Sequence, residues 1–436
     1  MKTSGKTSGV TRRGFIKTAA VASAALAVSG WAGRAAAAGS DTIRVGLVGC
    51  GGRGLHDTTM CLNSTPGVEL VAMGDVFKDR LDSCLEELRK AFGPEAANRI
   101  KVTPETSFVG FDAIQKVVQL PNVDLMILTT PPHFRPQHLR AAITAGKHAF
   151  IEKPVAVDPV GVRSVIESAD LADQKNLTIV AGTQARRMVH RVELMKRLRD
   201  GALGDITGGV CVRMGDAMRS WGPAERQPQW SDMEWQIRNW LFHTWLSGDF
   251  VDEMHVHELD VMNWMVGSTP EVVTAIGGRQ ARTGDKFGDV YDHFSAELTY
   301  PGDVRVSYLG AQIDGTDRPG NERLTGTKGT AYSGWDTSWI KGANPYQWEG
   351  QLPEPCLIQH ADQIAAIREG KKLNEGRRIA ESTLTALMVR MSAYTGRSIQ
   401  WKWALNSSKL DLSPQKYELG ALPKPEVAMP GLTQLV

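Results

Sequence analysis

The residues from Gly49 to Gly54 follow the pattern G-x-G-x-x-G, directly after the apolar run 43–48 and before a stretch with helical spacing. In that setting the first glycine permits a tight turn, the second lets the backbone approach a pyrophosphate, and the third lets a helix pack on a strand. The amino end of the helix then faces the phosphates. We therefore predict a dinucleotide site, with a plain glycine turn as the alternative. Its loop residues are Gly49, Gly51, Gly52, Arg53 and Gly54.

Asp75 closes the next apolar run, 68–73, about twenty residues beyond the glycines. A carboxylate at this place accepts a hydrogen bond from the ribose 2′-hydroxyl and repels a 2′-phosphate. Lys78 and Arg80 lie nearby and could tolerate that phosphate. We predict NAD as the cofactor, with NADP as the less favoured alternative.

Lys153 stands in the triplet Glu152-Lys153-Pro154, after the apolar run 148–151. Strand ends at the carboxyl edge of a parallel sheet face the cofactor crevice. A lysine there can hold a substrate hydroxyl, or ease its deprotonation by its positive charge. By itself the triplet is also common on protein surfaces, so its meaning depends on the neighbouring motifs.

A second set of candidates lies in the stretch 252–260, which we expect to start a helix that continues through Trp264. On one helix, Glu253, His257 and Asp260 fall at i, i+4 and i+7 and share a face. A carboxylate beside an imidazole favours its charged form and fixes its tautomer. Such a histidine can take the proton of a hydroxyl while hydride leaves the same carbon. The alternative is a solvated or helix-capping histidine cluster.

A metal site is another possible use of His243, His255 and His257. Because His255 and His257 are two residues apart, their side chains diverge on a helix, and we predict no metal. The five cysteines are scattered, odd in number and without a C-x-x-C pair. This pattern argues against both a disulfide framework and a zinc site.

Five tryptophans lie between residues 219 and 249. Tryptophans mostly pack in cores or against surfaces, and we expect that of at least half of these. Sugar rings also stack on aromatic faces, and Trp240 or Trp245 beside Arg238 would suit a carbohydrate. Polar loops with glycine and aromatic residues are usual places for binding.

The elements that must position these residues alternate in type. Apolar runs at 43–48, 68–73, 123–128 and 148–151 alternate with helical patterns at 55–62, 79–92 and 138–145. This alternation predicts an α/β fold with a parallel, doubly wound sheet, the Rossmann dinucleotide-binding domain. β-type segments dominate the later region, which we expect to be an α/β domain with an open, largely antiparallel sheet. The predicted ranges are 1–38 for a leader, 39–160 for the Rossmann domain, 161–405 for a substrate and oligomerisation domain, and 406–436 for an extended strap.

Positive charge is concentrated at the amino end of the 436 residues. Lys plus Arg is 50 and Asp plus Glu is 48, so the formal net charge is +2. Residues 1–38 hold six basic residues and no acidic one, which leaves 44 basic and 48 acidic residues, a net charge of −4, in the remainder. This balance excludes a large, uniformly basic surface for nucleic acid.

The same first residues read as an export signal. The sequence Thr-Arg-Arg-Gly-Phe-Ile-Lys at 11–17 resembles the twin-arginine export motif, and a mildly apolar run and Ala-x-Ala sequence follow it. We expect the twin-arginine export machinery to carry the folded protein to the periplasm, with a disordered basic tail as the alternative. The apolar run is too short for a stable membrane anchor, and no later segment has the ~18 consecutive apolar residues of a membrane helix.

Three motifs in combination carry a resemblance to a known family. Glu152-Lys153-Pro154 is preceded by Ala-Gly-Lys-His at 145–148 and by Thr-Thr-Pro-Pro at 129–132. From about residue 42 to about residue 405, the chain resembles the Gfo/Idh/MocA oxidoreductases. The resemblance implies a Rossmann domain followed by an open-faced α/β domain that places substrate over the nicotinamide.

The resemblance also implies roles for residues on the Rossmann side. It makes Lys153 the lysine at the reaction centre, and it places Glu152, Thr130 and Pro131 along the nicotinamide. Arg135 stands where many relatives have a histidine, so that contact departs from the family pattern.

In the second domain the family commonly has Asp-x-x-x-His-x-x-Asp beside the substrate. His257 and Asp260 match this pattern, and Glu253 replaces the first aspartate. An arginine that often faces the substrate cleft is matched as well. The predicted substrate-binding residues are Arg186, Arg238, Trp240, Trp245, His255 and Asp260.

The sequence thus predicts an exported NAD-dependent oxidoreductase acting on a sugar, cyclitol or glycoside, with Lys153, His257 and Glu253 as its catalytic residues. Free nicotinamide cofactor is not expected in the periplasm, so we expect NAD to be loaded before export, to stay bound and to be regenerated in place. One alternative is a redox-neutral NAD-dependent glycosidase or lyase that passes through a keto-sugar, and another is a non-catalytic sugar-binding protein. We also expect a homo-oligomer and no nucleic-acid partner.

Overall fold

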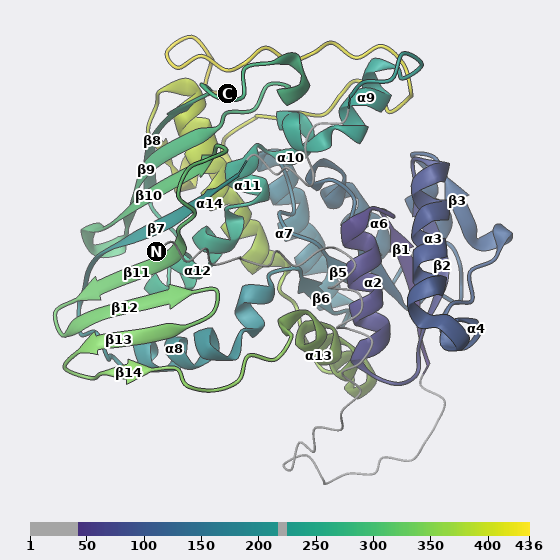
Figure 1. The fold of residues 1–436 in the computed structure, drawn as a ribbon, viewed down its shortest axis with the longest axis horizontal. Coiled ribbons are helices and arrows are strands. Elements are labelled where there is room, and N and C mark those ends of the chain that lie inside the picture. Colours follow the sequence, from purple (N-terminus) through teal and green to yellow (C-terminus); the bar gives the residue numbers. More distant parts are fainter. Residues whose placement is uncertain (1–41, 217–224) are drawn as a thin grey trace, which may run out of the picture. The chain divides into compact units, whose positions relative to one another are not determined.

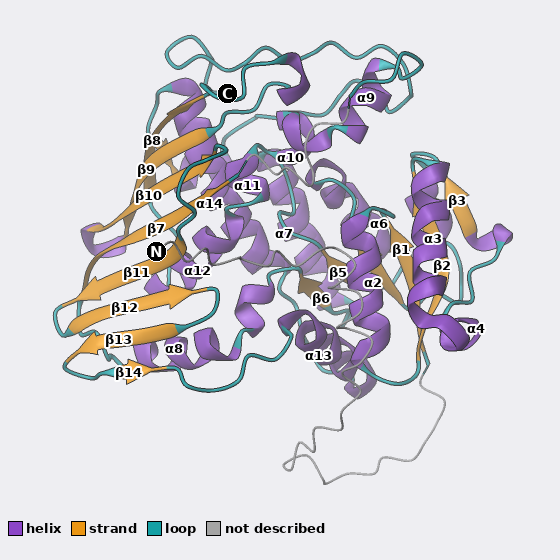
Figure 2. Cartoon of the chain, in the orientation of Figure 1, coloured by secondary structure: helices purple, strands orange, loops and turns teal. Residues whose placement is uncertain are grey.

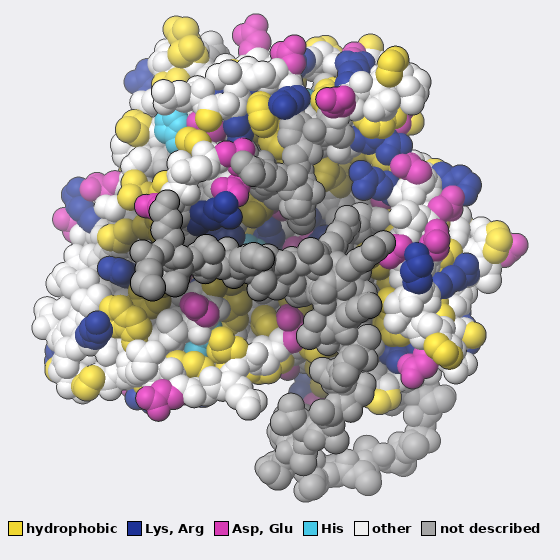
Figure 3. All heavy atoms as spheres, in the orientation of Figure 1, with side chains coloured by type: hydrophobic (Ala, Val, Ile, Leu, Met, Phe, Trp, Pro, Cys, Tyr) yellow, Lys and Arg dark blue, Asp and Glu magenta, His cyan; other side chains and the backbone are white. Residues whose placement is uncertain are grey.

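The computed structural model describes residues 42–216 and 225–436, and the predicted leader, residues 1–38, lies outside the described residues. Two sheets organise the described part, one of six strands and one of nine (Figure 1). No helix within these two ranges is long and apolar enough to cross a membrane. On the visible described surface, basic and acidic side chains are interspersed rather than gathered into one basic patch (Figure 3).

The six-stranded sheet has the order β3-β2-β1-β4-β5-β6, and every neighbouring pair is parallel. The strands β1 and β4 are buried almost throughout, as expected where helices cover both faces of a sheet. This order and direction confirm the predicted Rossmann fold class. The strands are β1 (Ile43–Val48), β2 (Val68–Asp75), β3 (Ser107–Val109), β4 (Leu125–Leu128), β5 (His148–Ile151) and β6 (Ile179–Ala181).

Alternate residues of β1 point to two different apolar clusters. Val45 and Leu47 pack with residues of the helices α2 and α3, whereas Val48 packs with residues of α5, α6 and α7. The helices therefore cover the sheet on both faces, and the turns that follow the strands meet at its carboxyl edge. The helices are α2 (Gly52–Ser64), α3 (Lys78–Phe92), α5 (Ala113–Val118), α6 (Arg135–Thr144) and α7 (Pro159–Gln174).

The nine-stranded sheet has the order β14-β13-β12-β11-β7-β10-β9-β8-β15 (Figure 2). Only the pair of β7 and β10 is parallel in this sheet, which confirms the predicted, largely antiparallel second domain. Its strands are β7 (Ile206–Gly215), β8 (Val272–Gly278), β9 (His293–Tyr300), β10 (Val304–Gln312), β11 (Gly320–Gly326), β12 (Gly329–Gly334), β13 (Ser338–Gly342), β14 (Tyr346–Gln347) and β15 (Ile399–Gln400).

One face of this sheet is covered and the other is open. The helices α12 and α14 (Gly376–Thr395) share the main apolar cluster with its strands. The opposite face exposes Val210, Ile276 and Leu309 by 39%, 74% and 46% of their surface. Apolar side chains exposed together on one face of a sheet commonly mark a surface that binds another protein.

The sequence pattern predicts one helix across 252–264, but the structure has two. α11 (Phe250–Glu253) ends where the His255 N–H donates to a carbonyl five residues back, at 3.2 Å, and α12 (Val256–Val266) begins after it. A hydrogen bond that spans five residues is of the π-helical type and widens the helix locally. The His255 ring binds the Tyr308 hydroxyl, with 2.5 Å between Nδ1 and that oxygen. Helical periodicity carries no sign of this long-range contact, which holds the chain at the break.

The remaining α-helices connect these layers. They are α4 (Ala96–Arg99), α8 (Val189–Arg199), α9 (Asp232–Arg238), α10 (Thr244–Ser247), α13 (Pro355–Glu369) and α15 (Trp401–Asn406). After α15, residues 407–436 contain no helix or strand. This segment, here called the strap, is the yellow trace in Figure 1 and passes above α9 and α10 in that view.

Gly54 is predicted to be a position where even one methyl group destabilises the fold. A Cβ on Gly54 would lie 2.0 Å from the Gly49 carbonyl oxygen, so Gly54→Ala is expected to lower the free energy of unfolding by about 2 kcal/mol or more. Gly52→Ala is the matched control in the same helix turn, because a Cβ there meets nothing within 4 Å. Urea unfolding of both variants measures the difference. Equal stabilities of the two variants would show that α2 can move away from the Gly49 carbonyl without loss of stability, and would contradict the prediction.

Candidate active site

The four glycines of the loop have different surroundings: two are tightly packed and two have open space beside them. Gly49 has a φ of +101°, and a Cβ there would lie 2.5 Å from the Thr130 nitrogen. Gly51 and Gly52 have no atom within 4 Å of an added Cβ, so the backbone is bare on that side. Gly51 precedes α2 and provides no side-chain cap for it. The loop thus leaves the first N–H groups of a helix free for an anion, as a pyrophosphate site requires.

Asp75 lies directly beside this loop. Its carboxylate accepts hydrogen bonds from the backbone N–H groups of Cys50 at 2.7 Å and Phe77 at 2.9 Å. Burial raises the pKa of Asp75, while these two hydrogen bonds act in the opposite direction. Lys78, which could have received a phosphate, is paired with Asp82 at 2.5 Å. The place and charge of Asp75 fit a ribose with a free 2′-hydroxyl, and therefore fit NAD.

The predicted residues after β4 lie against the glycine loop as well. The Thr129 hydroxyl donates to the Gly49 carbonyl at 2.6 Å, and the Thr130 hydroxyl lies 3.1 Å from His138 Nδ1. Pro131 follows directly and precedes a short helical turn. The segment is therefore held at the edge where the strands β1 and β4 end.

Glu152 links the glycine loop to the reaction centre. It is 1% exposed and receives Arg53, whose Nη2 lies 2.6 Å from Oε1. Burial raises the pKa of Glu152, but the charges of Arg53 and Lys153 outweigh it and the net shift is downward. Arg53 also lies 3.2 Å from Asp57, whose pKa burial raises to about 6. Because the Arg53 side chain keeps 30% of its surface exposed, it can also face a phosphate.

Lys153 joins the two domains. Its Nζ donates to the Glu253 main-chain carbonyl and to the Glu253 carboxylate, the latter at 3.1 Å. The expectation that Glu253 orients His257 is therefore not met, because the carboxylate contacts Lys153 instead. The cause is the helix break, which removes the i to i+4 relation between Glu253 and His257. The other carboxylate oxygen of Glu253 is buried and has no partner in the described part of the chain.

His257 lies in the same group but stays uncharged. Burial holds the pKa of His257 well below its ordinary value, and the charges of Lys153, Arg213 and Arg53 add to this effect. The ring is 8% exposed, and its Nδ1 is buried without a hydrogen-bond partner among the described residues. A neutral imidazole beside a lysine can accept a proton from a substrate hydroxyl.

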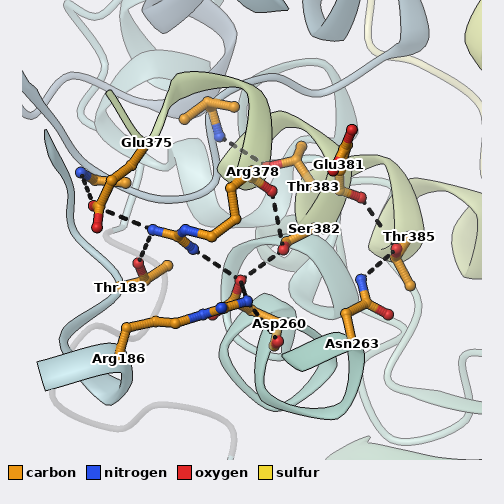
Figure 4. A network of polar contacts seen from close by, with 12 residues as sticks. Thr183, Arg186, Asp260, Asn263, Glu375, Arg378, Glu381, Ser382, Thr383 and Thr385 are labelled. Carbon is orange, nitrogen blue, oxygen red and sulfur yellow. Dashed lines mark hydrogen bonds and ion pairs between the residues drawn. The ribbon is translucent and has the colours of Figure 1, made fainter. Parts of the chain in front are cut away.

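Asp260 is fully buried in a network rather than free for a substrate (Figure 4). Its carboxylate accepts hydrogen bonds from Arg186 at 2.8 and 2.9 Å, from Arg378 at 3.0 Å and from Ser382 at 2.6 Å. Burial raises the pKa of Asp260, but the two arginines outweigh it and hold it well below its usual range. The network links α12 to α14, and within it the charge of Arg186 is paired with Asp260.

Arg186 also borders a separate hollow. A cavity of about 540 Å³ lies at the carboxyl end of α12, where Arg186 stacks on Trp264 at 4.6 Å from the ring centre. Its lining comes from α8, α12 and α14, and from the residues that follow α12. The structure thus brings Arg186 to Asp260 but not to the group around Lys153.

Four other predicted substrate residues lie elsewhere. Arg238 binds Asp79 with two hydrogen bonds of 3.0 Å. Trp245 is 5% exposed and packs with Trp240 in one apolar cluster. His255 is wholly buried against the second sheet. None of the four lies with Lys153 and His257. Arg238 and His255 are held by other hydrogen bonds, and the two tryptophans pack in an apolar cluster.

The structure also places three residues beside His257 that the sequence reasoning did not find. Trp335, in the turn between β12 and β13, meets the His257 ring edge-on at 5.7 Å between ring centres. Its Nε1 donates to Glu258 at 3.0 Å, and Arg213 donates to the same carboxylate oxygen at 2.7 Å. One of twelve tryptophans in the chain carries no local signal that marks it for a site. Among the described residues, no group of three or more His, Cys, Asp or Glu side chains could hold a metal ion.

Comparison with known proteins agrees with this geometry. The description "Oxidoreductase family, NAD-binding Rossmann fold" matches residues 43–182, and "GFO/IDH/MocA C-terminal domain" matches residues 192–332. The fold and the glycine loop define a protein with an NAD-binding Rossmann domain and a second α/β domain. The chain belongs to the Gfo/Idh/MocA oxidoreductase family.

Individual relatives are distant. The 2,7-anhydro-N-acetylneuraminate hydratase of Escherichia coli K12 is 26% identical over 211 residues, 48% of this chain and 51% of that protein. A glycosyl hydrolase family 109 protein of Streptomyces coelicolor is 26% identical over 168 residues, 38% of this chain and 33% of that protein. The chain thus spans about half or less of the length of these curated relatives. The solved structure of levoglucosan dehydrogenase with NADH and levoglucosan shares the fold, with a TM-score of 0.64 at 18% identity over 82% of this chain and 99% of that one.

The charge around His257 makes a measurable prediction. Of the neighbouring charges, that of Lys153 lowers the pKa of His257 most. Lys153→Met removes it and leaves the Glu253 carboxylate unpaired, so both effects are expected to raise this pKa. NMR titration of labelled histidines measures this pKa in the parent, where it is expected below the ordinary value of about 6.5. Lys116→Met is the control, because Lys116 is an exposed lysine paired with Asp112. An unchanged pKa of His257 in Lys153→Met would contradict the effect assigned to the Lys153 charge.

Proposed function

We propose that the protein is an NAD-dependent oxidoreductase that oxidises a CH–OH group of a sugar, cyclitol or glycoside. The observation that carries the proposal is the hydrogen-bonded pair of Lys153 and Glu253 beside the neutral His257, at the edge where the dinucleotide loop also lies. The names of the relatives, which act on sugars or anhydrosugars, support this class of substrate.

The side chains divide the chemistry of such an oxidation. Bound NAD supplies the acceptor for the hydride that leaves the carbon. Lys153, fixed by Glu253, donates a hydrogen bond to the substrate oxygen and stabilises its developing negative charge. His257 takes the hydroxyl proton, so the C–H and O–H bonds are broken and a carbonyl group forms.

The leader motif supports export as part of the proposal. Residues 11–17 resemble a twin-arginine signal, and this route carries folded proteins. A periplasmic enzyme has no ready supply of free NAD, so we propose that the cofactor stays bound and is regenerated on the protein. One substrate is then oxidised and another reduced in turn.

Contacts near Asp75 support a bound cofactor that is slow to leave. The guanidinium of Arg238, on α9, pairs with Asp79 and lies 3.9 Å from the ring centre of Phe77, two residues beyond Asp75. Asp75 is the residue expected at the adenosine ribose, so α9 lies next to that half of the site. The strap adds a second layer, since the Met233 N–H donates to the Gly420 carbonyl at 3.1 Å.

A second candidate function is a redox-neutral glycosidase or lyase that passes through a keto-sugar. The glycosyl hydrolase family 109 relative and the hydratase favour it by their names. It uses the same first oxidation, so Lys153 and His257 keep their roles, and it differs in returning the hydride to the altered sugar. A non-catalytic sugar-binding protein is the third candidate, and it has little use for the Lys153–Glu253 pair.

The open face of the second sheet supports a homo-oligomer. Val210 and Leu309 are exposed there on the neighbouring strands β7 and β10, and Ile276 is exposed on β8, with β9 between. A second copy of the chain would remove this apolar surface from water.

The proposed reaction predicts the behaviour of a lysine variant. In the purified parent protein, a panel of sugars, cyclitols and glycosides is expected to contain compounds that reduce bound NAD, seen as nicotinamide absorbance. Lys153→Met is expected to lower this rate by at least about a hundredfold, because it removes both the hydrogen bond and the charge at the oxygen. Product identification by mass spectrometry separates net oxidation from cleavage or elimination. Turnover of Lys153→Met at the parent rate would remove Lys153 from the mechanism.

Retention of the cofactor is tested by Arg238→Met. The parent is expected to keep NAD through gel filtration, as detected by absorbance and mass spectrometry. The variant loses two hydrogen bonds to Asp79 and the contact with Phe77, so its nucleotide is expected to dissociate about five- to thirtyfold faster. Arg305→Met is the control, since Arg305 is an exposed arginine paired with Glu297 and Asp303. A parent protein without nucleotide would refute the captive cofactor, whereas equal rates in parent and variant would refute only the role of Arg238.

A further inference from the structure

We infer that Trp335 is the platform on which the six-membered polyol ring of the substrate stacks with its C–H face. The inference rests on the proposed oxidation at Lys153 and His257 and adds the residue that recognises the sugar. It assigns this role to a turn of the second sheet, far in sequence from the tryptophans around α9 and α10.

Trp335 lies directly against His257. Its ring centre lies 5.7 Å from that of His257, with the two rings at 81° to one another. His257 is the residue that receives the hydroxyl proton, so the indole lies within reach of a sugar whose hydroxyl is at His257. Trp335 is half-buried, which leaves part of the indole free to make this contact.

The orientation of the indole is fixed by the protein. Its N–H donates to Glu258, a fully buried carboxylate of α12, at 3.0 Å. Arg191 and Arg213 flank the ring, at 5.2 and 5.3 Å from its centre. Because the N–H is already satisfied inside the protein, the exposed part of the side chain is apolar carbon. A rigid apolar surface is suited to the C–H face of a sugar ring.

Arg213 supplies the polar rim that such a ring also needs. Its side chain is 25% exposed, and one of its nitrogens binds Glu258 at 2.7 Å. Its other guanidinium nitrogens have no hydrogen-bond partner in the part of the chain that the structure describes. They can donate to ring hydroxyls while the indole contacts the C–H groups, so both kinds of sugar surface are matched.

Trp240 and Trp245 do not offer this combination. The Trp245 N–H donates to Gln236 at 2.7 Å within an apolar cluster that also contains Phe77 and Phe134. Its ring is 5% exposed and has no surface left for a ligand. Trp240 packs against the same cluster.

The experiment compares substitutions at Trp335 in the holoenzyme. Trp335→Leu keeps an apolar side chain but removes the aromatic face, and it is expected to raise KM for a pyranoside by at least about tenfold while kcat changes little. Trp335→Phe restores an aromatic face and is expected to bring KM back to within about threefold of the parent. Trp339→Leu is the control, because Trp339 lies on the same hairpin but stacks on Tyr332 at 5.1 Å.

Binding and folding are measured on the same proteins. Calorimetric titration uses methyl glucopyranoside, methyl galactopyranoside and N-acetylglucosamine as pyranoses and myo-inositol as a cyclitol, and thermal unfolding checks each variant. A folded Trp335→Leu that keeps the parent KM and sugar affinity would overturn the inference and leave the oxidation intact. A parent that binds these pyranosides through Trp335 but never reduces bound NAD would sink the proposed oxidation and keep the platform.

Discussion

The contact between Lys153 and Glu253 is the constraint on which the site depends. Lys153 follows a strand of the Rossmann sheet, and Glu253 ends a short helix of the second domain, one hundred residues away. A buried ammonium and a buried carboxylate must each have a partner, since either alone would be costly to hold out of water. Their pairing therefore fixes the two domains at the point where the dinucleotide loop and His257 also lie.

A second consequence concerns the charges around that pair. Glu152 and Glu258 are buried acids, and each is matched by an arginine that retains some exposure. The site thus keeps these negative charges buried and leaves the matching positive charges partly exposed. This arrangement suits an anionic cofactor. Burial keeps His257 neutral, and the nearby cations add to that effect because they disfavour a further proton.

Local patterns in the sequence were enough to predict much of this arrangement. The glycine loop and Lys153 lie just after strands and Asp75 ends one, and a strand followed by a turn is readable over a few residues. The parallel sheet and the antiparallel sheet are also confirmed. The helix across 252–264 was predicted wrongly in one respect, because the contact of His255 with Tyr308, 53 residues away, interrupts it. For the same reason Asp260 could not be separated from the substrate residues, since its partner Arg378 is 118 residues away.

The strap has a kinetic consequence. A segment without helices or strands has few internal hydrogen bonds, so it opens by local unfolding at a lower free energy than the sheets beneath it. Under the proposal of a captive cofactor, a nucleotide covered by this segment and by α9 exchanges at the rate of that local opening, and global unfolding is not required. The residence time of the cofactor then becomes a property of the weakest layer over the site, and it can change through the strap while the reaction centre stays as it is.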